Sequence, residues 1–178
     1  MDRVEVVVGD ITQLAVDAVV NAANAQLAGG GGVDGAIHRA AGYQQLQQAC
    51  RSLGGCPTGQ VKMTPGFNLP AKYIFHAVGP IWHGGRQGED RLLADCYRNA
   101  MALAAELGID SIAFPSISCG VYGYPADLAV VVAVDEVRRA LQKNSALKKV
   151  VFCCFDRHMA ELYQQHLHSR LGGPDKGS

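Results

Sequence analysis

Short apolar runs alternate along the chain with longer segments of helical periodicity, and this alternation limits the possible folds more than any other feature. The runs are rich in Val, Ile, Phe and Tyr, and several are apolar throughout, as expected of strands covered on both faces. Strands that alternate with helices predict an α/β sandwich with a largely parallel central sheet. We expect strands at residues 3–8, 18–21, 60–64, 72–78, 111–114 and 149–155.

Helical signals fill the intervals between these strands. Residues 90–107 carry apolar side chains at three- and four-residue spacing, and Gly108 follows as a stop. Pro125 suits the first position of a helix, and Asp127 would then lie in the first turn. We expect helices at residues 34–53, 90–107, 125–143 and 157–171, with Gly42 dividing the first into two pieces.

The length of 178 residues fits a single domain, which we assign to residues 1–171, and residues 172–178 read as a disordered tail. The six cysteines form no Cys-x-x-Cys pair and show no zinc-like spacing with the six histidines. A reduced protein of the cytoplasm, with neither metal nor cofactor, is therefore expected. The first residues enter a strand pattern with no signal peptide, and no apolar run reaches the ~18 residues of a membrane span.

Charge and glycine content narrow the kind of ligand. Sixteen basic residues balance sixteen acidic ones, so no global field attracts nucleic acid or an anionic membrane, and neither is expected as a partner. A phosphate-bearing ligand would have to be held by local features. Glycine is in excess, with 21 residues, six of them between positions 29 and 42. Such a cluster indicates a place where the backbone itself approaches another group.

The segment 21–35 leaves one expected strand, passes through four consecutive glycines and enters a helix. Its N–H groups, at the positive end of that helix, can cradle a phosphate without a lysine. Gly30, Gly32 and Gly35 match the dinucleotide pattern Gly-x-Gly-x-x-Gly, but the strand ends too early and no acidic residue follows ~20 positions later. A P-loop fails because no Gly-Lys-Ser/Thr follows. A flexible surface loop remains the alternative, which the adjoining helix disfavours.

Two further loops follow expected strands, at the sheet edge where α/β folds bind ligands. Residues 114–125 bring two glycines, two serines and two tyrosines to a helix entrance. That composition suits a second diphosphate-facing turn or an ordinary connection. In residues 9–12, Asp10 can cap a short helical turn or accept a hydrogen bond from an exocyclic amine.

Together these segments resemble the macrodomain family, and most closely its hydrolase branch, the bacterial O-acetyl-ADP-ribose deacetylases and their mono-ADP-ribosyl hydrolase relatives. The most specific run is Gly-Gly-Gly-Val-Asp-Gly-Ala-Ile-His-Arg-Ala-Ala-Gly, and the order and spacing of all segments span about residues 3–170. The resemblance implies a three-layer α/β/α sandwich with a mixed, largely parallel sheet, binding ADP-ribose above the strand ends. The segments that carry the resemblance are 9–12, 20–24, 29–41, 56–59, 69–72, 76–80 and 114–125.

The resemblance also implies residues that bind ADP-ribose. Asp10 would accept a hydrogen bond from the adenine amine, Ile11 would pack against the base, and Phe155 would form an aromatic wall. Asn21 would either join this site or satisfy loop backbone groups. The diphosphate would be held by Gly30, Gly31, Gly32, Val33, Ser118, Cys119, Gly120 and Val121.

For the reacting end, the resemblance implies that Asn24 and Asp34 contact the distal ribose. Asp34 would orient or deprotonate a water, sharing the role of base with the substrate phosphate, and Tyr122 would confine the water or pack on the ribose. Asp34 as a mere helix-terminal charge is the alternative. His38 is expected to pack its helix rather than act as a base. Cys119 replaces a threonine of many relatives, and no histidine is indicated to activate it as a nucleophile.

The implied activity is deacetylation of O-acetyl-ADP-ribose, with removal of mono-ADP-ribose from acidic side chains of proteins. ADP-ribose, its derivatives and mono-ADP-ribosylated proteins are the expected partners. A reader that binds ADP-ribose without turnover and a phosphatase acting on ADP-ribose 1″-phosphate are the alternatives. No metal ligand set is present, so metal-assisted hydrolysis is disfavoured.

Overall fold

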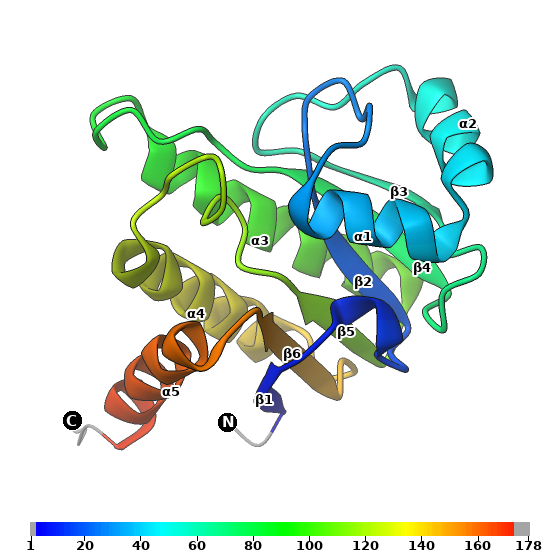
Figure 1. The fold of residues 1–178 in the computed structure, drawn as a ribbon. Coiled ribbons are helices and arrows are strands. Elements are labelled where there is room, and N and C mark those ends of the chain that lie inside the picture. Colours follow the sequence, from blue (N-terminus) through cyan, green and yellow to red (C-terminus); the bar gives the residue numbers. More distant parts are fainter. Residues whose placement is uncertain (1–2, 173–178) are drawn as a thin grey trace.

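The computed structural model describes residues 3–172, which form one six-stranded sheet between two layers of helices (Figure 1). The strand order is β1-β6-β5-β2-β4-β3, and every neighbouring pair is parallel except β3 with β4. The predicted α/β/α sandwich with a mixed, largely parallel sheet is therefore confirmed. The strands are β1 (Val4–Val8), β2 (Ala18–Ala23), β3 (Val61–Pro65), β4 (Tyr73–Val78), β5 (Ser111–Phe114) and β6 (Lys149–Cys154).

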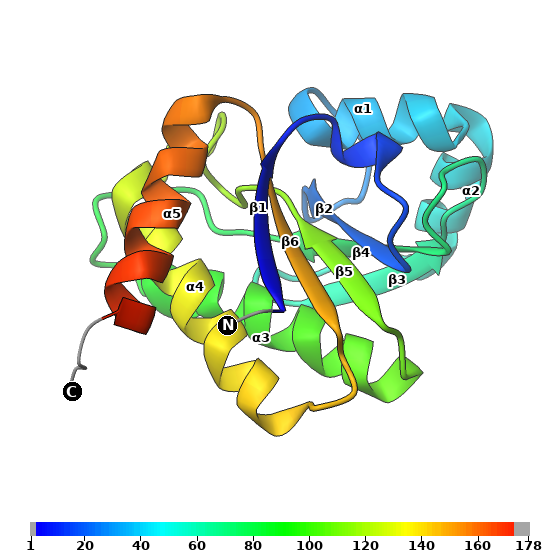
Figure 2. The same ribbon diagram turned by 90° about the horizontal axis from the view of Figure 1, so that it is seen from below.

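The helices divide between the two faces of the sheet, and Figure 2 shows α1 and α2 on one side of the strands and α3 and α4 on the other. Two helices cover one face, α1 and α2, and three cover the other, α3, α4 and α5. A short 3₁₀ turn, η1 (Ile11–Gln13), follows β1. The helices are α1 (Gly32–Ala41), α2 (Tyr43–Leu53), α3 (Glu89–Leu107), α4 (Ala126–Lys143) and α5 (Arg157–Gly172).

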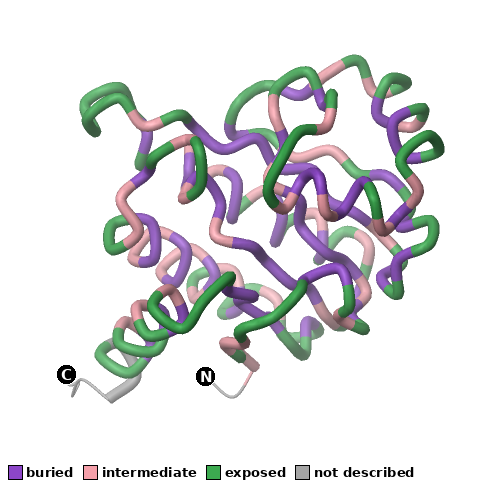
Figure 3. The backbone as a smooth tube through the Cα atoms, in the orientation of Figure 1, coloured by how far each residue is buried: buried purple, intermediate pink, exposed green. Residues whose placement is uncertain are grey.

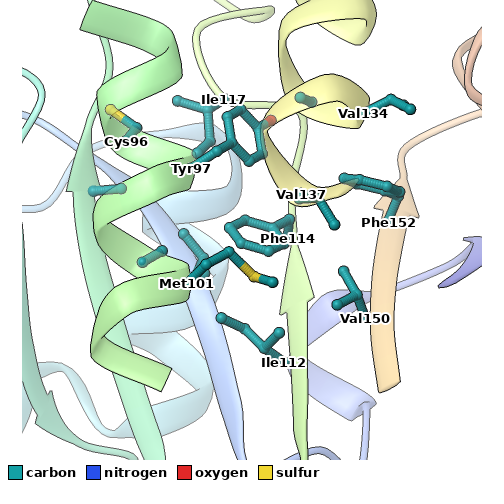
Figure 4. Packing of buried hydrophobic residues seen from close by; sticks show 14 of the residues in the cluster. Cys96, Tyr97, Met101, Ile112, Phe114, Ile117, Val134, Val137, Val150 and Phe152 are labelled. Carbon is teal, nitrogen blue, oxygen red and sulfur yellow. The ribbon is translucent and has the colours of Figure 1, made fainter. Parts of the chain in front are cut away.

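Alternate residues of the inner strands enter two separate cores. In β6, Val150 and Phe152 pack toward α3, α4 and α5, whereas Val151 and Cys153 pack toward α1 and α2. Phe114 lies at the centre of the larger core, between helices α3 and α4 (Figure 4). Strands β2, β4, β5 and β6 are buried along most of their length (Figure 3), whereas β1 and β3 at the edges of the sheet are not. Burial on both faces explains why these strands read as continuous apolar runs rather than as alternating patterns.

Several predicted boundaries move by one or two residues, and two of these shifts bear on the site. β2 continues to Ala23, so Asn21 lies inside the strand and not at its end, as the sequence had suggested. α1 begins at Gly32 rather than at residue 34. Pro125 is the N-cap of α4 and not its first residue, because its ψ of 126° is extended rather than helical.

The predicted breaks at glycine are confirmed. Gly42, with φ of 109°, separates α1 from α2, and Gly108 ends α3 in the left-handed conformation. Residues 173–178, most of the predicted tail, lie outside the described residues. Within residues 3–172, no helix is long and apolar enough to cross a membrane.

Candidate functional site

The candidate site lies at the carboxyl edge of the parallel strands, where the loops after β1, β2, β5 and β6 meet. β1, β6, β5 and β2 run parallel, so these loops leave the same edge of the sheet. In Figure 1 the blue segment after β2 and the yellow-green segment after β5 face each other across this edge. The structure thus brings together the three segments that the sequence singled out.

The glycine turn leads directly into α1 and exposes its first N–H groups. Gly31 is the N-cap, and Gly29 and Gly32 adopt positive φ angles of 80° and 57°. The first bond within the helix runs from the N–H of Gly35 to the carbonyl of Gly31 at 3.2 Å. The N–H groups of residues 32–34 precede it, so they are available to an anion, at the positive end of the helix dipole.

Asn24 holds this turn in place. Its Nδ2 donates to the carbonyl of Gly29 at 2.8 Å, and its Oδ1 accepts from the N–H of Ala28 at 3.0 Å. The side chain therefore orders its own loop, a use that the sequence did not reveal. One N–H of the amide is left for another partner, because Nδ2 carries two hydrogens.

Asp34, in the first turn of α1, is 5% exposed and points toward the glycine turn. Its Oδ1 accepts a hydrogen bond of 2.8 Å from Asn21 Nδ2 and lies 3.0 Å from His38 Nδ1. A Cβ added at Gly30 would stand 3.8 Å from Asp34 Oδ2 and 3.9 Å from Asn24 Nδ2. The carboxylate and the Asn24 amide therefore converge on Gly30, with Oδ2 turned toward the turn.

His38 is a donor to Asp34, and Gln47 of α2 sets its tautomer. Nδ1 of His38 lies 3.0 Å from both the carbonyl oxygen and Oδ1 of Asp34, which are acceptors, so Nδ1 carries the proton. Gln47 Nε2 donates to the carbonyl of Leu27 at 2.9 Å and lies 2.8 Å from His38 Nε2, which therefore accepts. This arm connects Asp34 with the loop that precedes the glycine turn.

His76 of β4 supports Asn21 from the opposite side. One hydrogen of Asn21 Nδ2 is directed to Asp34, so the other meets His76 Nδ1 at 3.2 Å, and His76 Nε2 lies 3.0 Å from Thr64 Oγ1. Burial, followed by the nearby His38, lowers the pKa of His76 to about 3, so the ring is neutral at physiological pH. Asn21 is fully buried. Its amide nitrogen bonds two side chains, so the alternative that Asn21 satisfies backbone groups of the loop is not what the structure shows.

The loop after β5 is held by internal hydrogen bonds. Ser118, at φ of 68°, is buried, and its hydroxyl donates to the carbonyl of Pro80 at 2.7 Å. The N–H of Cys119 is bonded to the carbonyl of Ser116 at 3.2 Å, so this amide is engaged within the turn. Gly120 and Val121 are exposed at its tip, with Val121 101% exposed. Of the predicted diphosphate contacts here, the geometry therefore favours residues 120 and 121.

The thiols have no nucleophilic character in this environment. Burial raises the pKa of Cys119 to about 11, and burial together with the charge of Asp34 raises that of Cys50 to about 11. Both remain protonated near neutral pH, and the thiolate is the reactive form. The described residues contain no group of three or more His, Cys, Asp or Glu that could hold a metal ion.

At the other end of the site, Phe155 stands beside the segment that follows β1. β1 and β6 pair in register up to Val8 and Cys154, and the N–H of Gly9 then donates to the carbonyl of Cys154 at 3.1 Å. Phe155 is 92% exposed and Asp10 is exposed next to this junction. An exposed aromatic ring near a carboxylate suits a planar base that carries an amino group.

Two expectations at this end change. Asp10 caps η1, since its Oδ1 accepts from the N–H of Thr12 at 3.0 Å and from Thr12 Oγ1 at 2.7 Å. This confirms the capping alternative and leaves Oδ2 for a ligand. Ile11 is only 5% exposed and packs in the core under α1, so its side chain has little surface for a base.

Sequence reasoning missed the groups behind Asp34, namely Gln47, Thr64 and His76. Each is a buried polar side chain. His76 interrupts the otherwise apolar run of β4, and a polar residue within such a run is the signal that could have flagged it. Their partners come from α1, α2, β2, β3 and β4, so the network could not be assembled without the fold. His38 does pack within the interior, as predicted, but it also contacts Asp34.

The chain matches the family model of the Macro domain over residues 20–133. A macro domain-containing protein of Chlorobaculum tepidum is 56% identical over 158 residues, 89% of this chain and 91% of that protein. An O-acetyl-ADP-ribose deacetylase of Enterobacter cloacae is 51% identical over 172 residues, 94% and 95% of the two chains. A mutant of the Oceanobacillus iheyensis macrodomain, solved with ADPR, shares the fold with a TM-score of 0.91 at 43% identity, covering 95% and 94%. The chain therefore belongs to the Macro domain family.

Proposed function

We propose that this protein binds ADP-ribose along the carboxyl edge of its sheet. The adenine would lie against Phe155, with Asp10 Oδ2 accepting from its amino group. The diphosphate would lie between the glycine turn and residues 120–121, held by N–H groups at the start of α1. This arrangement needs no Lys or Arg, in keeping with the balanced charge of the chain. The mutant macrodomain of Oceanobacillus iheyensis, solved with ADPR, supports the choice of ligand.

We infer further that the protein is a hydrolase that deacetylates O-acetyl-ADP-ribose and releases mono-ADP-ribose from acidic side chains of proteins. The observation that carries this inference is the buried Asp34 carboxylate, held at Oδ1 by Asn21 and turned by Oδ2 toward Gly30 and Asn24. A module that only binds ADP-ribose needs the glycine amides but has no need of an oriented, buried carboxylate. The relatives named O-acetyl-ADP-ribose deacetylase support the same reaction.

In the proposed reaction, a water attacks the carbonyl carbon of the ester on the distal ribose. The tetrahedral intermediate then loses the ribose oxygen, which takes up the proton that the base accepted from the water, and the acid is released. Asp34 Oδ2 or a phosphate oxygen of the substrate accepts the proton of the water, and the free N–H of Asn24 orients the ribose hydroxyls. N–H groups of the glycine turn stabilise the developing negative charge, and Tyr122 confines the water.

The test is product analysis with the wild type, Asp34→Ala and Asn24→Ala on O-acetyl-ADP-ribose and on a mono-ADP-ribosylated acidic peptide. We expect both variants to lose roughly 100-fold or more in kcat/KM, because a misplaced water or ribose forfeits the orientation effect. Asp127→Ala is the matched control, since Asp127 is also an aspartate in the first turn of a helix but lies exposed on α4. Full activity in both site variants refutes the mechanism.

Asp34→Asn separates the two candidates for the base. If Asp34 accepts the proton, kcat/KM of Asp34→Asn falls as far as that of Asp34→Ala. If the substrate phosphate accepts it, the asparagine variant retains a larger share of activity, because it still orients the water by hydrogen bonding.

Two other functions give different results in the same experiments. A reader binds ADP-ribose tightly in calorimetry and releases neither acetate nor ADP-ribose. A phosphatase releases inorganic phosphate from ADP-ribose 1″-phosphate faster than it cleaves either ester. We place the protein in the cytoplasm, because all six cysteines are free, as is usual in a reducing compartment.

A further inference from the structure

A cavity adjoins the candidate site on the side of Tyr122. Its volume is about 360 Å³, and Ala25, Gln26 and Tyr122 are among its lining residues. Ala25 and Gln26 directly follow Asn24 in the chain, so the cavity borders Asn24 and Tyr122, the residues that the proposed function assigns to the distal ribose and the attacking water. It therefore lies on the side of the site from which the group esterified to that ribose would extend.

The wall of this cavity is rigidly connected to the site. The N–H of Trp82 donates to the carbonyl of Tyr122 at 2.8 Å, and Ser118 Oγ donates to the carbonyl of Pro80 at 2.7 Å. A Cβ at Gly79 would fall 2.2 Å from Ser118 Oγ, so only glycine permits this close approach. Residues 79–82 and the loop after β5 therefore hold a fixed mutual position.

Glu89 orders the outer part of the same wall. Its Oε2 accepts from the N–H of His83 at 2.7 Å and of Gly85 at 3.1 Å, and its Oε1 accepts from the N–H of Gln87 at 2.7 Å. The carboxylate is 1% exposed, so its hydrogen-bonding capacity serves the loop rather than a ligand. The backbone of segment 83–89 is therefore held in one conformation by hydrogen bonds to Glu89.

The lining carries one carboxylate, that of Glu89, which is engaged by backbone N–H groups, and its other side chains are polar or apolar. Gln26, Thr58 and Gln87 offer amide and hydroxyl groups, whereas Pro80, Ile81 and Leu92 offer apolar surface. Neither Lys nor Arg is found among the described lining residues, so no fixed cation would retain a carboxylate once it is released. Gln26, Thr58, Ile81, His83 and Gln87 are all exposed, so the cavity opens to solvent and a longer chain can leave it.

Size distinguishes the two substrates of the proposed function. At about 360 Å³ the cavity is far larger than a site for one or two waters. An acetyl group fills only a small part of that space. A glutamate or aspartate side chain with its flanking peptide units matches the volume, the mixed polar and apolar lining and the opening to solvent.

We propose that this cavity is the subsite for the acid half of the ester, and that it takes the modified acidic side chain of a protein together with its adjoining backbone. The proposal rests on the proposed hydrolase function and specifies its substrate. Thr58 and Gln87 are its specificity-determining residues, because their side chains line the cavity without belonging to the candidate ADP-ribose site.

The test fills the cavity without touching the candidate ADP-ribose site. Thr58→Trp and Gln87→Trp place a large side chain at exposed positions, so both variants are expected to fold. Gln48→Trp, at an exposed position of α2 outside the cavity, is the matched control. Each protein is assayed on O-acetyl-ADP-ribose and on a peptide that carries mono-ADP-ribose on a glutamate, and its affinity for ADP-ribose is measured by calorimetry.

We expect both cavity variants to lose roughly tenfold or more in kcat/KM on the peptide, the size of effect that pocket shape supplies. Deacetylation and ADP-ribose affinity stay at the control value. Equal loss on both substrates, or loss on neither, overturns the inference. A wild type that cleaves O-acetyl-ADP-ribose but not the peptide also overturns it and leaves the deacetylase function standing. A wild type that cleaves neither refutes the proposed hydrolase function itself, and the subsite with it.

Discussion

Asn21 Nδ2 donates a 2.8 Å hydrogen bond to Asp34 Oδ1, and both side chains are buried. Asn21 stands in β2 and Asp34 in the first turn of α1, so this bond links the sheet to the helix across the glycine-rich loop. A buried carboxylate without donors is costly, and Asn21 and His38 supply them. The bond therefore fixes the position of the carboxylate and offsets the cost of burying it.

The variant Asn21→Ala is expected to weaken catalysis more than binding. Without the amide, Asp34 loses one donor and a small cavity forms, at a cost of about 1–3 kcal/mol in the free energy of unfolding. The misplaced carboxylate lowers kcat on O-acetyl-ADP-ribose by roughly 100-fold, while ADP-ribose affinity measured by calorimetry changes little. Asn68→Ala, at an exposed position, is the control. An unchanged kcat in Asn21→Ala would show that the bond has no functional role.

The variant Gly35→Ala is expected to destabilise the protein although alanine favours helices. A Cβ at this position would lie 2.5 Å from the carbonyl oxygen of Gly30, far inside contact distance, so α1 or the glycine turn must shift. We expect a loss of about 1–3 kcal/mol in urea unfolding, together with weaker ADP-ribose binding. Gly120→Ala serves for comparison, because no atom lies within 4 Å of its added Cβ. Equal stability of the two variants would contradict the close approach.

Glu89 is expected to make the wall of the cavity beside Tyr122 sensitive to acid. Burial opposes ionisation of Glu89, but the backbone N–H groups of His83, Gln87 and Gly85 outweigh it and lower the pKa to about 2. The unfolded state takes up this proton near pH 4.5 and the folded state only near pH 2, so the stabilisation is complete above 4.5 and is lost between these values.

Glu89→Gln removes this dependence, because an amide cannot accept at both of its ends. We expect the variant to show a shallower fall of the urea midpoint below pH 4.5 and faster proteolysis of residues 83–88 at pH 7. Glu106→Gln, on the exposed face of the same helix, is the control. Identical acid profiles for wild type and Glu89→Gln would count against the role of the backbone bonds.

His76 is expected to add a second, higher window of acid sensitivity. Its pKa is about 3 in the folded protein and near 6.5 when unfolded, so the unfolded state binds the proton first as the pH falls. Stability present above pH 6.5 is lost toward pH 3, at up to about 1.4 kcal/mol per pH unit from this residue. Urea unfolding of His76→Gln should lack this slope, whereas that of His158→Gln, at an exposed position of α5, should keep it. A slope retained in His76→Gln would assign it to another group.

The fold could be predicted largely from local patterns. Burial of β2, β4, β5 and β6 on both faces leaves continuous apolar runs, and Gly42 and Gly108 stand where the chain requires positive φ. Errors of one or two residues arose at element ends, as at Pro125, because capping geometry depends on ψ as well as on residue type.

The sequence by itself determined the α/β alternation and the glycine turn before α1, because periodicity and turn chemistry are local properties of the chain. The candidates Asn24, Asp34 and Phe155 came from the resemblance of the sequence to the macrodomain family. Only the tertiary structure decided that Asn21 and His38 hold Asp34, that Gln47 and His76 stand behind them, and that a cavity opens beyond Tyr122. These relationships join side chains from separate strands and helices. Their distances depend on sheet order and helix packing, which no single segment encodes.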